Sequence, residues 1–341
     1  MKKSILKSNT LLKLFLVLVA IAAIVLLSKQ CNNYQLTIVN SAIIYFISAM
    51  GYTVMLGMGG MMPMATVTFM GFGAFFTAQL SKNFGLPTPL AGLLAVAGAT
   101  LIAYILSIML VRLSSYYFVF GTIGLCNMMA TVFQNYKPLT NGADGINGIP
   151  KLELFGFQFR SLSDWCLLLS GIALIIMFIV SRIRKSSLGR SLMSIRDNAV
   201  AAETLGVNIR RTKRIAFTIG SMFSAIAGML VAYHNGVVSA SLFTFNVQQN
   251  LLMMVMLGGI NSTVGALGGA FLIQFMPEML RPIQEYMRLI QGIMLILLMI
   301  FMPMGIHGLI KTAYEKLKGK IMVKKEVSRV ESEERTGAFK S

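Results

Sequence analysis

The chain has 341 residues, of which 56% are hydrophobic and only 12% are charged, and its mean hydropathy is +0.73. Soluble domains carry about 25% charged residues, so this composition excludes an ordinary soluble protein. In a soluble chain the net charge of +18 would indicate a nucleic-acid partner. Here the basic residues cluster at the edges of apolar runs, which indicates contact with anionic membrane lipid and no nucleic acid.

The apolar runs predict an all-α polytopic membrane protein with about 8 to 10 transmembrane helices, because each span needs about 20 residues. The run 14–27 follows a lysine-rich start, and the residues after it form a poor signal-peptidase site. A retained first helix is therefore favoured over a cleaved signal peptide. Further spans are predicted at 36–57, 61–81, 88–111, 115–135, 164–181, 215–234, 248–260, 264–280 and 289–310.

Charge placement orients these spans in the membrane. With ten spans and both termini in the cytoplasm of a bacterial cell, 23 of the 30 Lys and Arg residues lie inside, as the positive-inside rule requires. The predicted organisation is a transmembrane domain over 1–310 and a charged cytoplasmic tail over 311–341. Within the domain, 182–214 is a cytoplasmic loop and 136–163 is the longest external loop.

The cytoplasmic loop 182–214 is basic and amphipathic. It holds nine Lys and Arg residues against two acids, Asp197 and Glu203. Its apolar residues recur at intervals of three and four, which predicts one helix ending at Gly206. They are Leu188, Leu192, Ile195, Ala199, Ala202 and Leu205. We expect this helix to present its apolar face to a cytoplasmic partner, the alternative being a helix on the lipid surface.

Two glycine-rich stretches predict interrupted helices. The first is 57–73, which also contains Pro63. The second is 248–280, where two short apolar runs favour broken or re-entrant helices and hence part of a translocation pathway. Close packing of helices through small residues explains such glycines equally well. The glycines of the second stretch are Gly258, Gly259, Gly265, Gly268 and Gly269.

The external loop contains the sequence NGADGING at 141–148. Its spacing of acidic and amide residues does not meet the pattern of a calcium-binding EF-hand loop. A glycine-rich turn is the favoured interpretation, and contact with an external partner or with substrate is the alternative. We expect no metal site in this chain.

Polar side chains inside spans are candidate pathway residues, because they usually face the interior of a bundle. Asn127 and Gln134 are seven residues apart and so share one helical face. Gln274 and Glu278 are four apart and share another. Glu278 also lies near the predicted outer boundary, so exposure to headgroups explains it equally well. Three cysteines, Cys31, Cys126 and Cys166, have no metal-ligand spacing and are expected to serve as packing residues.

The sequence contains no phosphate-binding loop of the form GxxxxGK(S/T), no HExxH and no GxSxG. His234 and His307 are isolated at span ends. These observations predict no catalytic residue and no cofactor bound by this chain. A membrane-bound enzyme would need a polar cluster at one interface, and a stand-alone secondary transporter would need charged residues within its spans.

Several stretches carry a resemblance to a known family. They read LGRSLMSIRDNAVAAETLGVN at 188–208, KRIAF at 213–217, LLMMVMLGGINSTVGALGGA at 251–270 and PEMLR at 277–281. Similar stretches occur at 112–125 and 139–150. Together they resemble the branched-chain amino acid permeases of ABC importers, and most closely the second permease of each pair. The resemblance covers 36–310.

The resemblance implies a permease that pairs with a related permease, with two cytoplasmic ATPase subunits that bind ATP and with an external solute-binding protein. Importers of this kind contact the ATPase through a helix marked EAAxxxG, which here falls on Val200, Ala201, Ala202 and Gly206. Val200 replaces the glutamate. The resemblance assigns the ATPase contact to Leu192, Ile195, Arg196, Asp197, Ala201, Ala202, Glu203 and Gly206.

The implied substrates are branched-chain amino acids. Related permeases carry urea, short amides or other small polar solutes, and more distant ones carry sugars or nucleosides.

Overall fold

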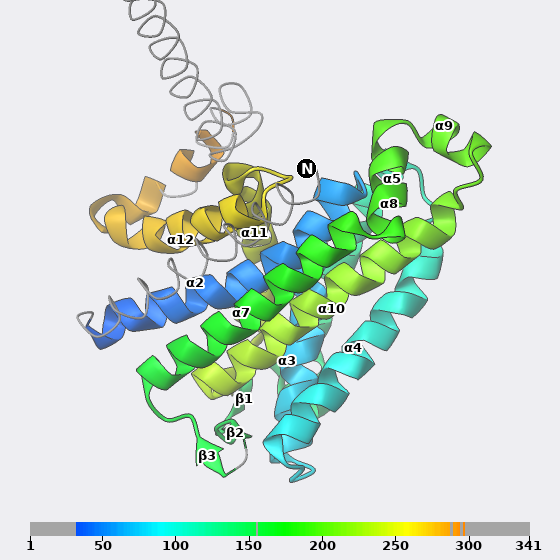
Figure 1. The fold of residues 1–341 in the computed structure, drawn as a ribbon. Coiled ribbons are helices and arrows are strands. Elements are labelled where there is room, and N and C mark those ends of the chain that lie inside the picture. Colours follow the sequence, from blue (N-terminus) through cyan, green and yellow to red (C-terminus); the bar gives the residue numbers. More distant parts are fainter. Residues whose placement is uncertain (1–31, 155, 287–288, 294–295, 297–341) are drawn as a thin grey trace, which may run out of the picture.

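The computed structural model describes residues 32–154, 156–286, 289–293 and 296. The predicted spans 14–27 and most of 289–310, and the tail 311–341, lie outside these residues, as does Cys31. The described part is a helical bundle (Figure 1), which confirms the predicted all-α class. Its long helices are α2 (Asn33–Tyr52), α3 (Thr66–Lys82), α4 (Thr88–Leu110), α5 (Ser115–Asn135), α7 (Leu162–Lys185), α10 (Ile209–Asn235), α11 (Phe245–Gly258) and α12 (Thr263–Met279).

These helices correspond to the eight spans predicted between 36 and 280. Five helical segments in the described residues are long and apolar enough to cross a membrane, namely Asn33–Met58, Thr88–Leu110, Ser115–Asn135, Leu162–Lys185 and Ile209–Asn235. By contrast, α11 and α12 have 14 and 17 residues. At 1.5 Å per residue they are about 21 and 25 Å long, shorter than the roughly 30 Å hydrocarbon core. The prediction of short, interrupted helices over 248–280 is confirmed.

The interruption predicted within 57–73 is also present, in its first half only. After α2 the chain continues as the π-helix η1 (Thr53–Met58) and leaves helical structure until α3 begins at Thr66. The predicted span 61–81 was therefore wrong at its start. Proline at position 63 excludes a regular helix through this segment, since it lacks the N–H and clashes with the preceding turn.

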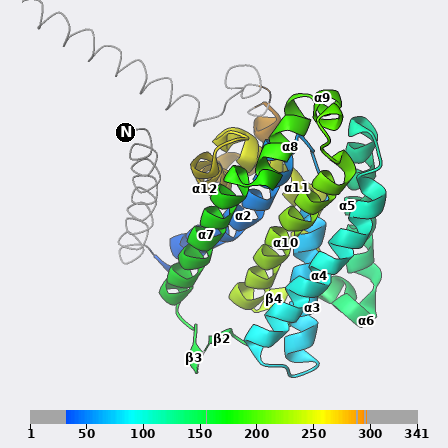
Figure 2. The same ribbon diagram turned by 45° about the vertical axis from the view of Figure 1, so that its right-hand side comes forward.

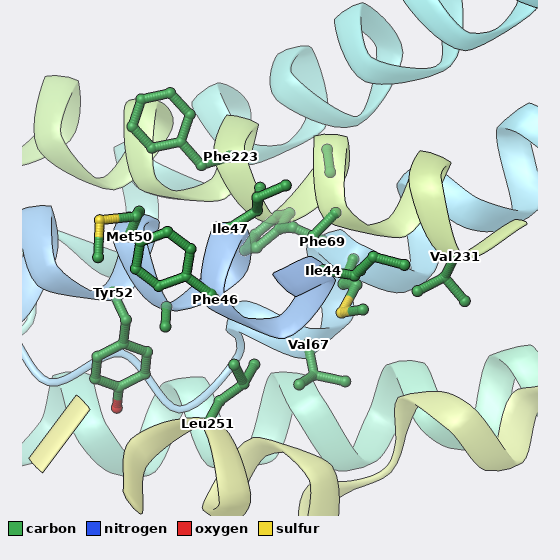
Figure 3. Packing of buried hydrophobic residues seen from close by; sticks show 14 of the residues in the cluster. Ile44, Phe46, Ile47, Met50, Tyr52, Val67, Phe69, Phe223, Val231 and Leu251 are labelled. Carbon is green, nitrogen blue, oxygen red and sulfur yellow. The ribbon is translucent and has the colours of Figure 1, made fainter. Parts of the chain in front are cut away.

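The centre of the bundle is formed by α2, α3 and α10. Nearly all side chains of α2 from Ala42 onward are buried, as expected for a helix that is apolar on every face. Figure 3 shows Phe46 and Met50 of α2 below Phe223 of α10, with Leu251 of α11 on the opposite side. Thus α2 is enclosed by its neighbours, and α4, α5 and α7 form the outer wall.

Backbones approach closely where α10 crosses α2 and α3. A Cβ atom at Gly228 would lie 1.8 Å from the carbonyl oxygen of Met70, and one at Gly51 would lie 2.3 Å from that of Gly220. No larger residue fits at these crossings. Small residues at helix crossings are the usual device of membrane bundles, in which dispersion contacts replace the hydrophobic effect.

Short strands and turns cover one end of the bundle, opposite the end that carries α8 and α9 (Figures 1 and 2). This end includes α6 (Lys137–Thr140), η2 (Gly142–Asp144), η3 (Ala240–Phe243), the antiparallel pair of β1 (Ile146–Asn147) with β4 (Val237–Val238), and the pair of β2 (Glu153–Leu154) with β3 (Phe157–Gln158). Asn141 and Gly145 have φ of 61° and 67°, and the Asn141 side-chain amide donates to the Gly145 carbonyl. The predicted glycine-rich turn is confirmed.

Candidate functional site at the α8 end of the bundle

The cytoplasmic loop predicted at 182–214 folds into two short helices, α8 (Ser187–Asp197) and α9 (Ala199–Thr204). The single helix predicted from Leu188 to Gly206 was wrong. Asn198 interrupts it with extended backbone at φ −156° and ψ 106°. Its side-chain oxygen accepts a hydrogen bond from the Ala201 N–H at 3.1 Å. Asn198 is therefore the N-cap of α9, whereas in one continuous helix it would be an interior residue. Asparagine favours such capping positions over helix interiors.

The end of this segment follows the prediction. Gly206 has φ of 84°, its N–H donates to the Glu203 carbonyl, and the Val207 N–H donates to the Ala202 carbonyl. This is the Schellman arrangement, in which a left-handed residue, usually glycine, closes the helix. Asn208 then caps α10 by accepting from the Arg211 N–H at 3.0 Å. Both ends of α9 are therefore fixed by local sequence.

Arg196 joins α8 to two other parts of the bundle. Its Nη1 donates to the Gly57 carbonyl at 2.6 Å and to Asn261 Oδ1 at 2.9 Å. Gly57 belongs to η1, and Asn261 lies in the turn between α11 and α12. Arg184, near the end of α7, donates to the Asn261 backbone carbonyl. The two arginines thus connect α7 and α8 with both interrupted regions of the fold.

The apolar stripe of the loop divides between two environments. Leu192, Ile195 and Ala202 are 0%, 4% and 2% exposed, so they pack against this chain. The structure therefore gives these three side chains a packing role within the chain, and their predicted contact with an ATPase stays a prediction. Val200 and Leu205 are 72% and 83% exposed. The surface that remains available is α9, which carries apolar side chains that nothing in the described residues covers.

The polar members of the predicted contact also differ from one another. Ala201, Glu203 and Gly206 are exposed. Asp197 is exposed over 69% of its side chain and pairs with Arg196 at 3.0 Å. Arg196 itself is directed to the chain's own backbone. The exposed set is thus concentrated after Asn198, on α9 and the turn that closes it.

The position of α8 depends on Gly189. A Cβ atom there would lie 2.2 Å from the Ile183 carbonyl oxygen, which belongs to the last turn of α7. We predict that Gly189→Ala displaces α8 and breaks the hydrogen bonds of Arg190 and Arg196 to the Lys185 and Gly57 carbonyls, so that trypsin cleaves the segment several-fold faster in inside-out vesicles. Gly171→Ala is the matched control, because Gly171 on α7 has no neighbour within 4 Å of an added Cβ. Equal cleavage rates in both variants would contradict the close contact.

The interrupted segment between η1 and α3 lies against buried polar side chains. Gln248 of α11 is fully buried. Its Oε1 accepts from the Val67 N–H at 2.9 Å and its Nε2 donates to the Pro63 carbonyl at 3.3 Å. Thr122 Oγ1 accepts from the Met64 N–H at 3.0 Å. Non-helical backbone inside a membrane needs such partners, and sequence analysis missed both residues.

Asn127 and Gln134 share a face of α5, as predicted, and both are exposed. The same face continues toward the α8 end with Tyr117 and Phe120, which are 70% and 69% exposed. Thr131, also exposed, lies between the two amides. The face is therefore polar near the strand-bearing end and aromatic near the other, and no described residue covers it.

The glycines at the α11–α12 turn are explained by helix packing. A Cβ at Gly258 would lie 2.3 Å from the Gly265 carbonyl oxygen, and one at Gly269 would lie 2.0 Å from that of Met254. Gly259 adopts φ of 98° at the turn itself. These contacts favour the packing interpretation for Gly258, Gly265 and Gly269, whereas an added Cβ at Gly268 would have no neighbour within 4 Å. Gly258 and Gly259 are buried, and no pathway role is needed to account for them.

Gln274 and Glu278 lie on α12 at the strand-bearing end. Gln274 is half-buried. Glu278 accepts a hydrogen bond from the Tyr34 hydroxyl at 2.7 Å and lies 3.7 Å from the Arg281 guanidinium. These contacts join the ends of α2 and α12 near the surface. They favour the boundary interpretation of Glu278. Cys126 and Cys166 are both buried, as expected for packing residues.

Comparison with known proteins identifies the family of the chain. Residues 34–299 match the model of the branched-chain amino acid transport system / permease component family. The LivM high-affinity branched-chain amino acid transport system permease protein of Escherichia coli (strain K12) is 30% identical over 321 residues, covering 86% of this chain and 74% of the relative.

Two further relatives match over shorter stretches. The LivH permease protein of the Escherichia coli (strain K12) branched-chain amino acid system is 27% identical, over 53% of this chain and 61% of the relative. The LsrC autoinducer 2 import system permease protein of Enterobacter sp. (strain 638) is 28% identical, over 58% and 56%. No solved structure matches the chain significantly. The chain is an integral membrane protein and belongs to the branched-chain amino acid transport permease family.

Proposed function

We propose that this chain is a permease subunit of an ABC importer and forms half of a translocation pathway for branched-chain amino acids, driven by separate ATPase subunits. The observation that carries the proposal is α9, a short helix held by its own caps, with Val200 and Leu205 exposed beyond the end of the bundle. Exposed apolar side chains on a fixed helix are typical of a protein-binding surface. The partner we propose for this surface is a cytoplasmic ATPase, and on this proposal the α8 end would face the cytoplasm.

The substrate class rests on the relatives. The two LivM proteins, from Escherichia coli and Salmonella typhimurium, cover 86% of this chain, whereas the LsrC relative from Enterobacter covers 58%. The longer match favours branched-chain amino acids over the autoinducer of the other system. Urea, short amides and other small polar solutes are the alternative substrates within the same family.

A second permease subunit would complete the pathway. The chain resembles both LivM and LivH, which are named for the same transport system. The exposed face of α5 fits the position between two permeases, because Asn127, Thr131 and Gln134 would be costly against lipid. An external solute-binding protein would then dock at the strand-bearing end. The ATP would be bound by the ATPase subunits.

We predict that Val200→Asp combined with Leu205→Asp reduces co-purification of the ATPase subunits about tenfold or more. Each change places a charge in an apolar contact, and unpaired charges at such contacts cost several kcal/mol. Leu113→Asp is the control, since Leu113 is 43% exposed in the connection after α4 and lies outside α8 and α9. Normal ATPase recovery with the double variant would show that α9 is not the contact.

The function itself is tested by reconstitution. The chain, its partner permease, the ATPases and the binding protein are placed in liposomes, and ATP-dependent uptake of labelled leucine, urea and acetamide is compared. We expect saturable leucine uptake that stops without ATP. Uptake of urea in place of leucine would redirect the substrate assignment. Uptake that proceeds without ATPase subunits would favour a stand-alone secondary transporter instead.

A further inference from the structure

An apolar groove runs along the outside of the bundle between α4 and α7, with α10 as its floor. Its volume is about 780 Å³, and its lining includes Leu101 of α4, Ile172 of α7 and Met222 of α10. The neighbouring surface of α4 is also apolar, since Leu94, Ile105 and Met109 are 44%, 55% and 71% exposed. This wall of the bundle differs from the polar face of α5. The groove and this part of α4 are therefore suited to contact with lipid acyl chains.

A basic pocket adjoins this groove at the α8 end. It has a volume of about 510 Å³ and is lined by Tyr104, Asn208, Arg210, Arg211, Arg214 and Ile215. We call these six residues the arginine pocket. Tyr104 lines both the pocket and the groove. On α10, Arg214, Thr218 and Met222 follow at intervals of four, so one face of the helix changes from cationic to apolar.

The charges of the arginine pocket are not neutralised by the protein. Within residues 32–154 and 156–286 the ion pairs are Arg196 with Asp197 and Arg281 with Glu278, and neither involves the pocket. The Nε atom of Arg214 is buried and has no hydrogen-bond partner. A buried guanidinium nitrogen without an acceptor is costly. An anion held there would supply both the charge and the acceptor.

We propose that an anionic phospholipid binds to this surface, with its phosphate in the arginine pocket and one acyl chain in the groove. Arginine matches phosphate geometry well, and basic pockets beside transmembrane helices are known to bind acidic headgroups. From Thr218 to Tyr233 the floor of the groove is about 22 Å long at 1.5 Å per residue. One leaflet contributes about 15 Å of hydrocarbon, so the groove accommodates one chain from the leaflet beside the pocket.

The groove and the arginine pocket form one continuous surface, because Tyr104 lines both of them. This continuity favours a phospholipid over a protein partner. An ATPase would contact the pocket without entering the groove, and a second permease would cover the groove without supplying an anion for Arg214. A single phospholipid would supply an anion to the arginine pocket and an acyl chain to the groove. It would also fill the space between α4 and α7, because α4 packs mainly on α10 and α3 whereas α7 packs mainly on α2.

Native mass spectrometry of the full-length chain tests this proposal. The detergent-purified chain is mixed with equal amounts of dioleoyl phosphatidylglycerol and dioleoyl phosphatidylcholine, which differ only in their headgroups. We expect the wild type to retain phosphatidylglycerol preferentially. Arg211→Gln with Arg214→Gln should lower that preference about tenfold, since each nearby basic residue contributes measurably to anionic-lipid binding. Arg182→Gln with Lys185→Gln removes the same charge outside the pocket and should leave it unchanged.

A second pair of variants tests whether an acyl chain occupies the groove. Ala97→Trp fills the groove and should reduce retained phosphatidylglycerol, whereas Leu94→Trp adds the same ring on α4 away from the residues that line it. Equal losses in the two charge variants, or in the two tryptophan variants, would overturn the proposal. So would full lipid retention by the Arg211/Arg214 variant combined with loss of the ATPase subunits. The measurement does not depend on transport, so its failure is distinguishable from failure of the proposed function.

Discussion

Replacing Arg196 with glutamate should lower ATP-dependent uptake about tenfold or more while the ATPase subunits still co-purify with the permease. The wild-type guanidinium donates to the Gly57 carbonyl and to Asn261 Oδ1. A hydrogen bond from a charged group contributes about 1.5–3 kcal/mol, toward the lower value here because 30% of the side chain is exposed. Losing two of them would weaken the link between α8 and the interrupted helices. About 1.4 kcal/mol of lost coupling corresponds to a tenfold effect.

Binding of the ATPase and transmission of its movement would depend on different residues. Val200 on α9 and Leu205 directly after it would bind the ATPase, and Arg196 would transmit the movement of α9 to η1 and to the α11–α12 turn. Arg196→Glu should therefore leave basal ATP hydrolysis in place and reduce the solute transported per ATP. Lys185→Glu is the charge-matched control, because Lys185 is exposed at the same end and is outside this network. Unchanged transport stoichiometry in the Arg196 variant would remove Arg196 from the coupling path.

The sequence predicts the helices of this fold well because lipid leaves few alternatives. Each span must be apolar and must satisfy its own backbone, so the apolar runs locate eight of the described helices, although α10 begins at Ile209, before the predicted start at 215, because its first turns are basic. The sequence also predicts the stop at Gly206, since a left-handed residue is needed to close α9. The start of α3 is shifted because the apolar run continues through 61–65, although the backbone there is not helical.

The candidate site was less predictable, because periodicity does not reveal what an apolar face contacts. Leu192 and Leu205 belong to the same stripe, yet the first is buried in the bundle and the second is 83% exposed. The difference arises at Asn198, whose side chain caps α9 and redirects the chain. The role of Arg196 depends on Gly57 and Asn261, which are distant in sequence. Such contacts come from tertiary packing and are not encoded in local spacing.

Gln248→Leu should destabilise the protein by about 2–5 kcal/mol, the largest stability loss we expect from a side chain of unchanged size. The substitution leaves the Val67 N–H and the Pro63 carbonyl without their partner, and each unsatisfied buried polar group costs about 1–3 kcal/mol. Neither group can find a replacement in the helix, because residues 59–65 are not helical. The apolar gain of a leucine side chain is small, because the unfolded helices stay in contact with detergent or lipid hydrocarbon, which is as apolar as leucine.

The adjacent residue, Gln249, provides the control, because from the sequence alone the two glutamines cannot be told apart. Gln249 is exposed on α11, so Gln249→Leu should change the free energy of unfolding by less than about 0.5 kcal/mol. Unfolding in mixed detergent micelles with increasing dodecyl sulfate measures both variants against the wild type. If the two leucine variants unfold together, the Gln248 side chain is not what stabilises the interruption. That role would then fall to Thr122, whose hydroxyl oxygen accepts from the Met64 N–H.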